Sequence, residues 1–380
     1  MRRVFAALAL GMTAAAHAAH EGHAQLGATA AFDAAGGVLA AYKDGSHVVV
    51  RRSADFGRTW STPRRVNAVP EPVAAEGEAR PKIATGTRGE VYVTWTRPLS
   101  KPYTGEIRFA RADDVDAPFS APVTVHTDRQ EITHRFDALS VGPGGRLYVA
   151  WIDKRDLELA KRAGAAYAGA AVYVAVSDDG GKSFRGDFKL ADHSCECCRI
   201  ALLPEADGGL LALWRHVFEP NVRDHALARL DGDGNAAPLR RVTFDDWRID
   251  ACPHHGPSLA RDEAGRLHAV WFSGAPGRSG VFYARLGDNA PLPRLVGDDT
   301  AAHADLAVSG SRLLVAWKSF DGERTHLEIM RSDDGGETWR TRKLSHTDGP
   351  SDQPRVLTHA GRFFVFWNTA HEPLSMHEVE

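Results

Sequence analysis

The chain has 380 residues and a formal net charge of −3 at pH 7, with 46 Lys and Arg residues against 49 Asp and Glu residues. It contains no basic run, so the charge pattern argues against nucleic acid or an anionic membrane as the main partner. Hydrophobic residues make up 43% of the sequence, which is enough for a sizeable core. We therefore expect a globular protein whose partner is small.

The amino terminus has the parts of a secretory signal peptide. The basic start Met1-Arg2-Arg3 is followed by an apolar run from Val4 to Ala15 and by the small-x-small sequence Ala16-His17-Ala18. The apolar run is too short to span a bilayer, and no later segment approaches transmembrane length. We therefore predict that residues 1–18 are removed, that the protein is periplasmic or secreted, and that residues 19–380 form one domain.

Seven segments of similar design follow. In each one, a small turn residue precedes an apolar, β-rich run that ends in an aromatic residue six positions later. The pairs are Gly36 and Tyr42, Gly89 and Trp95, Gly145 and Trp151, Gly208 and Trp214, Gly265 and Trp271, Ser311 and Trp317, and Gly361 and Trp367. A repeat of roughly 40 to 50 residues built from short strands is typical of a β-propeller. The sequence therefore predicts an all-β propeller with seven blades, in which a strand from about Ala19 to Leu26 completes the last blade.

Three octapeptides share the pattern Ser-x-Asp-x-Gly-x-(Thr or Ser)-aromatic, at residues 53–60, 177–184 and 332–339. Ser and Asp side chains can bond the backbone of a turn, and Gly takes the positive φ that other residues avoid. We expect each octapeptide to form a closed turn with its aromatic residue packed beneath it. Their role is then structural.

Polar groups stand where the innermost strands of repeats two to seven are expected to begin. Arg80, Arg135 and Arg199 occupy equivalent places in three consecutive repeats, and Asp137 follows Arg135. Guanidinium groups around one opening can clamp an anion or a carboxylate. The alternative is that they are solvated or paired with neighbouring carboxylates. We predict that Arg80, Arg135, Asp137 and Arg199 bind a ligand at the channel mouth, and that an Ala-rich stretch up to Ala171 forms a short helix as a lid.

All four cysteines lie in two motifs of neighbouring repeats. Cys195, Cys197 and Cys198 form Cys-x-Cys-Cys, and Cys252 opens Cys-Pro-His-His, which ends in His254 and His255. An even number of cysteines in an exported protein favours disulfides. Thiolates together with imidazoles are instead ligands for copper or zinc. Since adjacent blades bring the two motifs together, both a disulfide and a metal site made by these six residues stay open.

The three octapeptides resemble the Asp box, or BNR repeat, of the sialidase-like superfamily of β-propellers. The resemblance implies that each box joins the third strand of a blade to the fourth, on the face away from the ligand. It also offers a six-bladed ring as the alternative to seven blades. Sialidases carry an arginine on the first innermost strand and a Tyr and Glu pair as nucleophile, and neither has a match here. We therefore expect little or no hydrolysis of sialosides.

Three classes of function follow from the sequence. The first is an exported sialidase-like propeller that binds a glycan or an anion at the channel mouth and, if it is an enzyme, is a glycoside hydrolase. The second is a periplasmic metal-binding propeller that uses the cysteine and histidine motifs for copper or zinc. The third is a scaffold for protein assembly. Because many different functions share the β-propeller fold, the fold alone does not decide among these three classes.

Overall fold

The computed structural model of the chain describes residues 26–380 except residue 288. The predicted signal peptide and nearly all of the predicted closing strand, up to residue 25, lie outside the described residues. Among the described residues, no helix is long and apolar enough to cross a membrane.

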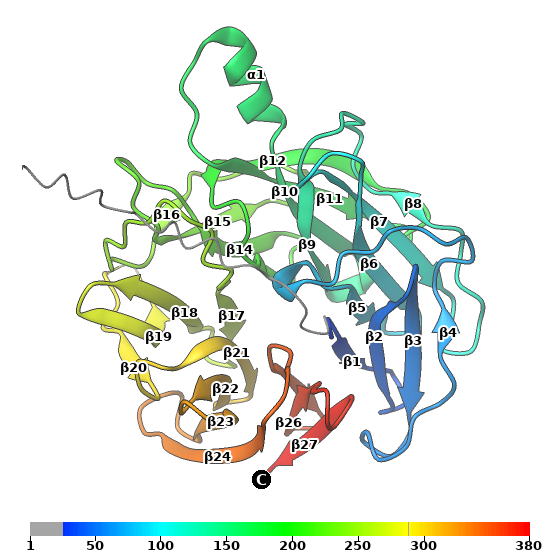
Figure 1. Ribbon diagram of the computed structural model, residues 1–380, viewed down its shortest axis with the longest axis vertical. Coiled ribbons are helices and arrows are strands. Elements are labelled where there is room, and N and C mark those ends of the chain that lie inside the picture. Colours follow the sequence, from blue (N-terminus) through cyan, green and yellow to red (C-terminus); the bar gives the residue numbers. More distant parts are fainter. Residues whose placement is uncertain (1–25, 288) are drawn as a thin grey trace, which may run out of the picture.

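Seven antiparallel sheets surround a central axis (Figure 1). The first three blades are β1 (Thr29–Phe32), β2 (Val38–Asp44), β3 (His47–Ser53) and β4 (Arg64–Arg65); β5 (Lys82–Thr85), β6 (Val91–Pro98), β7 (Gly105–Ala112) and β8 (Val123–Thr124); and β9 (His134–Val141), β10 (Leu147–Asp153), β11 (Ala170–Ser177) and β12 (Arg185–Ser194). The next two are β13 (Ala201–Pro204), β14 (Leu210–Arg215), β15 (His225–Leu230) and β16 (Arg240–Arg241); and β17 (Ser258–Arg261), β18 (Leu267–Ala275), β19 (Arg278–Leu286) and β20 (Arg294–Val296). The last two are β21 (Ala302–Ser309), β22 (Arg312–Phe320), β23 (Thr325–Ser332) and β24 (Arg340–Thr347); and β25 (Arg355–His359), β26 (Arg362–Trp367) and β27 (Ser375–Val379). The seven-bladed prediction is confirmed.

The predicted aromatic positions explain why the blades pack face to face. Each lies on the second strand of its blade, and Trp95, Trp151, Trp214, Trp317 and Trp367 are fully buried. Trp151, for example, lies in one apolar cluster with Tyr92 and Phe109 of the preceding blade. Since successive side chains of a strand point to opposite faces of the sheet, an unbroken apolar run is what a strand between two blades requires.

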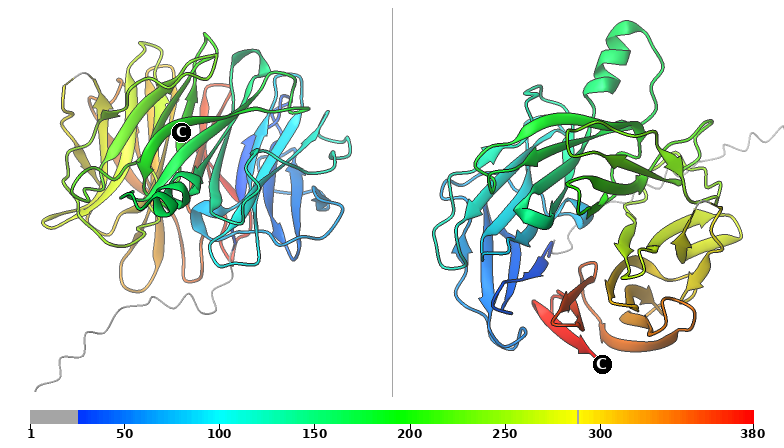
Figure 2. Two further views of the ribbon diagram at one scale, coloured as in Figure 1. Left: turned by 90° about the horizontal axis from the view of Figure 1, so that it is seen from above. Right: turned by 180° about the vertical axis from the view of Figure 1, so that it is seen from behind.

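The order of strands within a blade separates two faces of the disc. The turns from first to second strand and from third to fourth strand lie on one face, and the other connections lie on the opposite face, which we call the site face. The three octapeptides join β3 to β4, β11 to β12, and β23 to β24. The motifs around Cys195 and Cys252 precede innermost strands β13 and β17, so they lie on the site face. Figure 2 shows the disc edge-on and from behind.

The octapeptide turns close as expected. In the second one, the Asp179 carboxylate accepts hydrogen bonds from the Ser177 hydroxyl at 2.8 Å and from the Ser183 amide and hydroxyl at 2.9 and 2.6 Å. Gly181 takes a φ of 81° and donates its amide to Ser177 Oγ at 2.8 Å. The hydrogen bond from the Ser183 side chain is the main reason that the pKa of Asp179 falls to about 2. The final aromatic, Phe184, packs edge-on against Phe109 of the preceding blade.

The described part of the last blade has three strands. Side-chain contacts between this blade and the first blade therefore close the ring. The Asp352 carboxylate accepts the backbone amides of Gly27 and Ala28, each at 2.8 Å. Phe364 packs against both Phe32 and Phe56, with ring centroids 5.1 and 5.2 Å away. These contacts join segments more than 300 residues apart in the sequence.

The predicted short helix exists as α1 (Arg155–Ala163), between β10 and β11. In the face-on views it projects outward from the rim of the disc, so it does not cover the channel mouth as a lid (Figures 1 and 2). Arg155 fixes its first turn through ion pairs with Asp153 and Asp187, both at 2.7 Å. Two short 3₁₀ turns, η1 (Gly77–Ala79) and η2 (Pro143–Gly145), complete the elements.

Candidate functional site

Arg80 and Arg199 brace the innermost strands at the channel mouth. Arg80 donates to the carbonyls of Ala28 and Gln353, at 3.1 and 2.9 Å, and so reaches the first and last blades. Arg199 donates to the carbonyls of Pro257 at 3.0 Å, Gly256 at 3.2 Å and Ala304 at 2.9 Å, in the fifth and sixth blades. Both side chains are buried. These guanidinium groups therefore hold the ring together, and a role in ligand binding stays a prediction.

A buried carboxylate lies beside these two arginines. Glu78 is 3.7 Å from Arg199 Nη1, and the Lys82 ammonium donates to the Glu78 carbonyl at 2.9 Å. Burial acts to raise the pKa of Glu78, but the nearby Arg199, Arg80 and Lys82 outweigh it and lower that pKa. Burial also lowers the pKa of Lys82 to about 8. The mouth thus gathers three cationic side chains around one buried carboxylate, whose ion-pair partner is Arg199.

Arg135 and Asp137 have different surroundings. Both lie on β9, where Asp137 is buried and accepts hydrogen bonds from the Thr94 and Thr96 hydroxyls at 2.6 and 3.2 Å. Arg135 pairs with Glu76, whose side chain is 42% exposed, and lies over the Phe136 ring. Glu76 also lines a surface pocket of about 550 Å³ on the site face. Among the four predicted ligand-binding residues, Arg135 alone has a partner in this pocket.

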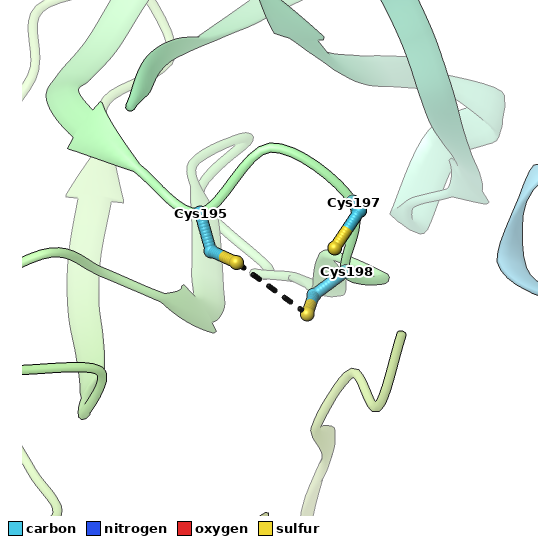
Figure 3. A group of neighbouring side chains, drawn as sticks. All are labelled: Cys195, Cys197 and Cys198. Carbon is cyan, nitrogen blue, oxygen red and sulfur yellow. Dashed lines mark hydrogen bonds between the residues drawn. The ribbon is translucent and has the colours of Figure 1, made fainter. Parts of the chain in front are cut away.

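The Cys-x-Cys-Cys motif folds into a compact group of sulfur atoms (Figure 3). It follows the end of β12 at Ser194, and the Cys195 amide donates to the Arg215 carbonyl at 2.9 Å. Cys195, Cys197 and Cys198 are 1, 3 and 2% exposed, and their sulfur atoms lie within 4.8 Å of one another. Cys195 Sγ and Cys198 Sγ are 3.9 Å apart. Glu196 points away to pair with Lys154.

These sulfur separations distinguish a metal site from a disulfide. A disulfide requires an S–S distance of about 2.05 Å, and all four cysteines are free thiols here. Three sulfur atoms that each lie about 2.3 Å from one metal ion are about 3.8 to 4.0 Å apart, by the geometry of trigonal or tetrahedral coordination. The disulfides offered by the sequence are therefore not formed. The Cys195–Cys198 separation of 3.9 Å equals that of two thiolates on one metal ion, and Cys197 Sγ lies within 4.8 Å of both.

The second motif meets the first through Cys252. This cysteine is exposed, and its interaction with Cys197 lowers its pKa. His255 stacks between Phe272 and His303, with both ring centroids at 4.1 Å. His254 lies 6.2 Å from the Phe136 ring. Within the described part of the chain, neither histidine belongs to the group of ligand atoms that Cys195, Cys197 and Cys198 form, so their metal-binding role stays a prediction.

Arg215, at the end of β14, is the residue that our sequence reasoning did not assign to the site. Its side chain is buried and donates to the carbonyls of Arg223, His255 and Phe272 at 2.8, 3.1 and 2.7 Å. Its own carbonyl accepts the Cys195 amide. One residue therefore fixes both cysteine motifs. Its signal in the sequence is an arginine that directly follows the buried aromatic of the fourth repeat, Trp214.

The electrostatics of the group single out Cys195. Hydrogen bonds with Cys197 and Cys198, helped by the charge of Arg215, hold the pKa of Cys195 well below its ordinary value. Contacts with Cys195 in turn raise the pKa of Cys197 and of Cys198. Because the thiolate is the form that binds metals, the lowered pKa of Cys195 favours metal binding by this group.

The chain shares its fold with several carbohydrate-active enzymes of known structure. An ulvan lyase of polysaccharide lyase family PL25, bound to -[GlcA(1-4)Rha3S]-, has a TM-score of 0.57 at 11% identity, and the match covers 90% of each chain. The polysaccharide lyase Uly1 has a TM-score of 0.52 at 9% identity, over 90% of this chain and 86% of that one. An α-L-arabinofuranosidase from Fusarium graminearum has a TM-score of 0.51 at 14% identity, over 85 and 92%.

No protein-family model matches the chain, and no curated protein is significantly similar to it. The comparisons with solved structures rest on identities of 9 to 14%, and they establish the propeller fold alone. Membership of the sialidase-like superfamily stays a prediction from the octapeptides.

Proposed function

We propose that this protein is a metal-binding propeller whose Cys195, Cys197 and Cys198 thiolates hold a copper(I) ion. The observation that carries the proposal is the buried group of sulfur atoms, all within 4.8 Å of one another. Thiolates are soft ligands that select copper(I) and zinc. The predicted export to the periplasm or cell exterior places this activity outside the cytoplasm.

The number of ligands favours copper(I) over zinc. Structural zinc sites almost always have four protein ligands, whereas the compact group here has three, all from one loop. Copper(I) is stable with three sulfur ligands in a plane. Its single charge leaves a bound centre with three thiolates negative, and the buried Arg215 guanidinium beside Cys195 offsets part of that charge.

The test is a competition for copper(I) in the absence of oxygen, with bathocuproine disulfonate as the competing chelator. We expect one copper(I) ion per chain, with X-ray absorption showing sulfur as the main ligand. Cys195→Ser and Cys198→Ser should each weaken binding by at least a hundredfold. Asp179→Ala, on the opposite face, serves as the matched control and should bind like wild type.

Two further measurements show which residues bind the metal and which metal is bound. His254→Ala with His255→Ala should retain copper(I) affinity, because His255 is held between Phe272 and His303. Zinc is titrated in parallel, and tighter binding of zinc than of copper(I), relative to standards, would replace copper by zinc in the proposal. Equally weak, millimolar binding of both metals by wild type and by Cys195→Ser would contradict it.

A second proposal is that the protein binds an acidic glycan at the pocket beside Arg135. It is favoured by the pocket of about 550 Å³, which Lys43, Glu71, Glu76 and Pro98 help to line on the site face. The Lys43 ammonium lines this pocket beside the Glu71 and Glu76 carboxylates, and Arg135 can bind a ligand carboxylate when it leaves Glu76. Calorimetry with a glucuronate-containing oligosaccharide tests this: Arg135→Ala should weaken binding at least tenfold, and no binding by wild type would contradict it.

A further inference from the structure

Burial divides the four cysteines into two kinds. Cys195, Cys197 and Cys198 are at most 3% exposed, whereas Cys252 is exposed. A donor that carries copper(I) on its own thiolates therefore cannot touch the buried sulfurs directly. Cys252 can meet such a donor, and Arg215 holds its motif beside the loop of the buried cysteines, because it binds both the Cys195 amide and the His255 carbonyl. The exposed thiol and the buried group thus lie on neighbouring loops of the site face.

The chain holds Cys252 in this position from both sides. On the amino-terminal side, Asn221 Nδ2 donates to Asp250 Oδ1 at 2.5 Å, and the Arg223 amide donates to the Trp247 carbonyl at 2.6 Å. On the carboxy-terminal side, Arg215 binds the His255 carbonyl at 3.1 Å. The segment between these anchors is exposed at Ala251 and Cys252. Cys252 therefore stays beside the loop of the buried cysteines and faces solvent at the same time.

We infer that Cys252 is the entry ligand, which takes copper(I) from a thiolate-bound donor and passes it to the buried cysteines. This inference rests on the proposed copper(I) function and adds a partner of stated chemistry, a copper(I) complex of thiols. In the first step a bond forms between Cys252 Sγ and copper, and a donor sulfur–copper bond breaks. The displaced donor thiolate takes up the proton that Cys252 loses. In the second step a bond forms between Cys197 Sγ and copper while the Cys252–copper bond breaks, and the Cys252 thiolate takes up the proton that Cys197 loses. Copper stays in the +1 state throughout.

The test separates the rate of loading from the affinity at equilibrium. Transfer from the copper(I)–glutathione complex is followed by stopped flow, and affinity is measured with bathocuproine disulfonate. Cys252→Ser should slow transfer at least tenfold while its affinity stays within tenfold of wild type. Cys198→Ser is the matched cysteine control and should lose affinity. In native protein, one thiol should react rapidly with a thiol reagent, and that reaction should disappear in Cys252→Ser.

The outcomes are distinct. An unchanged transfer rate in Cys252→Ser would overturn the inference. A loss of affinity as large as that of Cys195→Ser would overturn it too, because Cys252 would then be an equal member of the binding site. Failure of wild type to bind copper(I) at all would instead contradict the proposed function itself, before any question of entry arises.

Discussion

At the scale of single residues, Arg215 connects the fold to the proposed site. Its side chain donates to three backbone carbonyls, those of Arg223, His255 and Phe272, and its guanidinium lies 4.9 Å from the centre of the Trp247 ring. Arg215 therefore sets the distance between the loops of Cys195 and Cys252. The sulfur cluster depends on an arginine that carries no ligand atom.

Arg215→Met should lower the free energy of unfolding by about 2 to 4 kcal/mol, because buried carbonyls lose charged donors. It should also loosen the loop of His255, so that more than one cysteine reacts rapidly with a thiol reagent in the native state. Arg215→Lys keeps the charge on a shorter side chain. Its free energy of unfolding and its thiol reactivity should lie between those of wild type and Arg215→Met. Thiol reactivity identical to wild type in Arg215→Met would show that the two loops are held by other contacts.

A buried histidine makes the stability depend on pH. His126 Nε2 accepts the Ile107 amide at 3.2 Å, and its Nδ1 is 2.6 Å from the Asp128 carbonyl, so the ring is neutral. Burial, reinforced by His134, lowers the pKa of His126 to about 4 from an ordinary value of 6.5. The unfolded chain therefore binds a proton more readily. The stabilisation is complete above pH 6.5 and is lost as the pH falls towards 4.

We expect urea unfolding to show a free energy that decreases from pH 7 to pH 4.5. In His126→Gln, whose amide can accept and donate as the neutral ring does, the slope should fall by up to about 1.4 kcal/mol per pH unit, the contribution of one proton. A slope that is the same in wild type and His126→Gln would show that other groups account for the pH dependence.

The contacts of single residues also show what could not be predicted from the sequence. It identified Arg80 and Arg199 at the channel mouth, but their hydrogen-bond partners are carbonyls of other blades. Those carbonyls come together only when the ring forms, so no local pattern predicts them. The cysteine motifs were easier to place, because they precede the innermost strands of two adjacent blades, β13 and β17.

At the scale of elements, the octapeptide turns were predictable because each turn contains its own partners. In the second turn the hydrogen bonds of Asp179 all go to residues 177–183. The buried second strands were predictable for a similar reason, since their apolar runs are continuous in the sequence. Outer strands such as β4, β8 and β16, with two residues each, have no such pattern, because a neighbouring strand defines them.

Asp179→Ala should lower the free energy of unfolding by about 1 to 3 kcal/mol, because the turn loses a charged acceptor. The neighbour Asp178 is a matched control. It is 46% exposed and pairs with Arg146 and Arg185 at the surface, so Asp178→Ala should change stability by less than about 1 kcal/mol. Urea unfolding of both variants checks the comparison. Equal losses would mean that the turn gains nothing from the internal hydrogen bonds of Asp179.

At the scale of the whole molecule, the number of blades follows from the sequence, but the closure of the ring does not. Seven repeats predict seven sheets, since each repeat must cover its apolar faces with two neighbours. The junction between the last and first blades uses Asp352, Phe364 and Phe56, which no repeat pattern links. At this junction the ring is held by contacts between residues that are far apart in the sequence.

Two adjacent phenylalanines allow this junction to be tested. Phe364 packs against the first blade, whereas Phe363 packs in a cluster with Leu314 and Ile329 of the sixth blade. Both are fully buried, so either change to Ala should lower the free energy of unfolding by about 3 to 5 kcal/mol. The two variants should differ in which strands exchange their amide hydrogens faster. Phe364→Ala should speed exchange in β1, β2 and β25 to β27, and Phe363→Ala in β22, β23 and β26. If both variants speed exchange in the same strands, the contacts between the last and first blades are not what closes the ring.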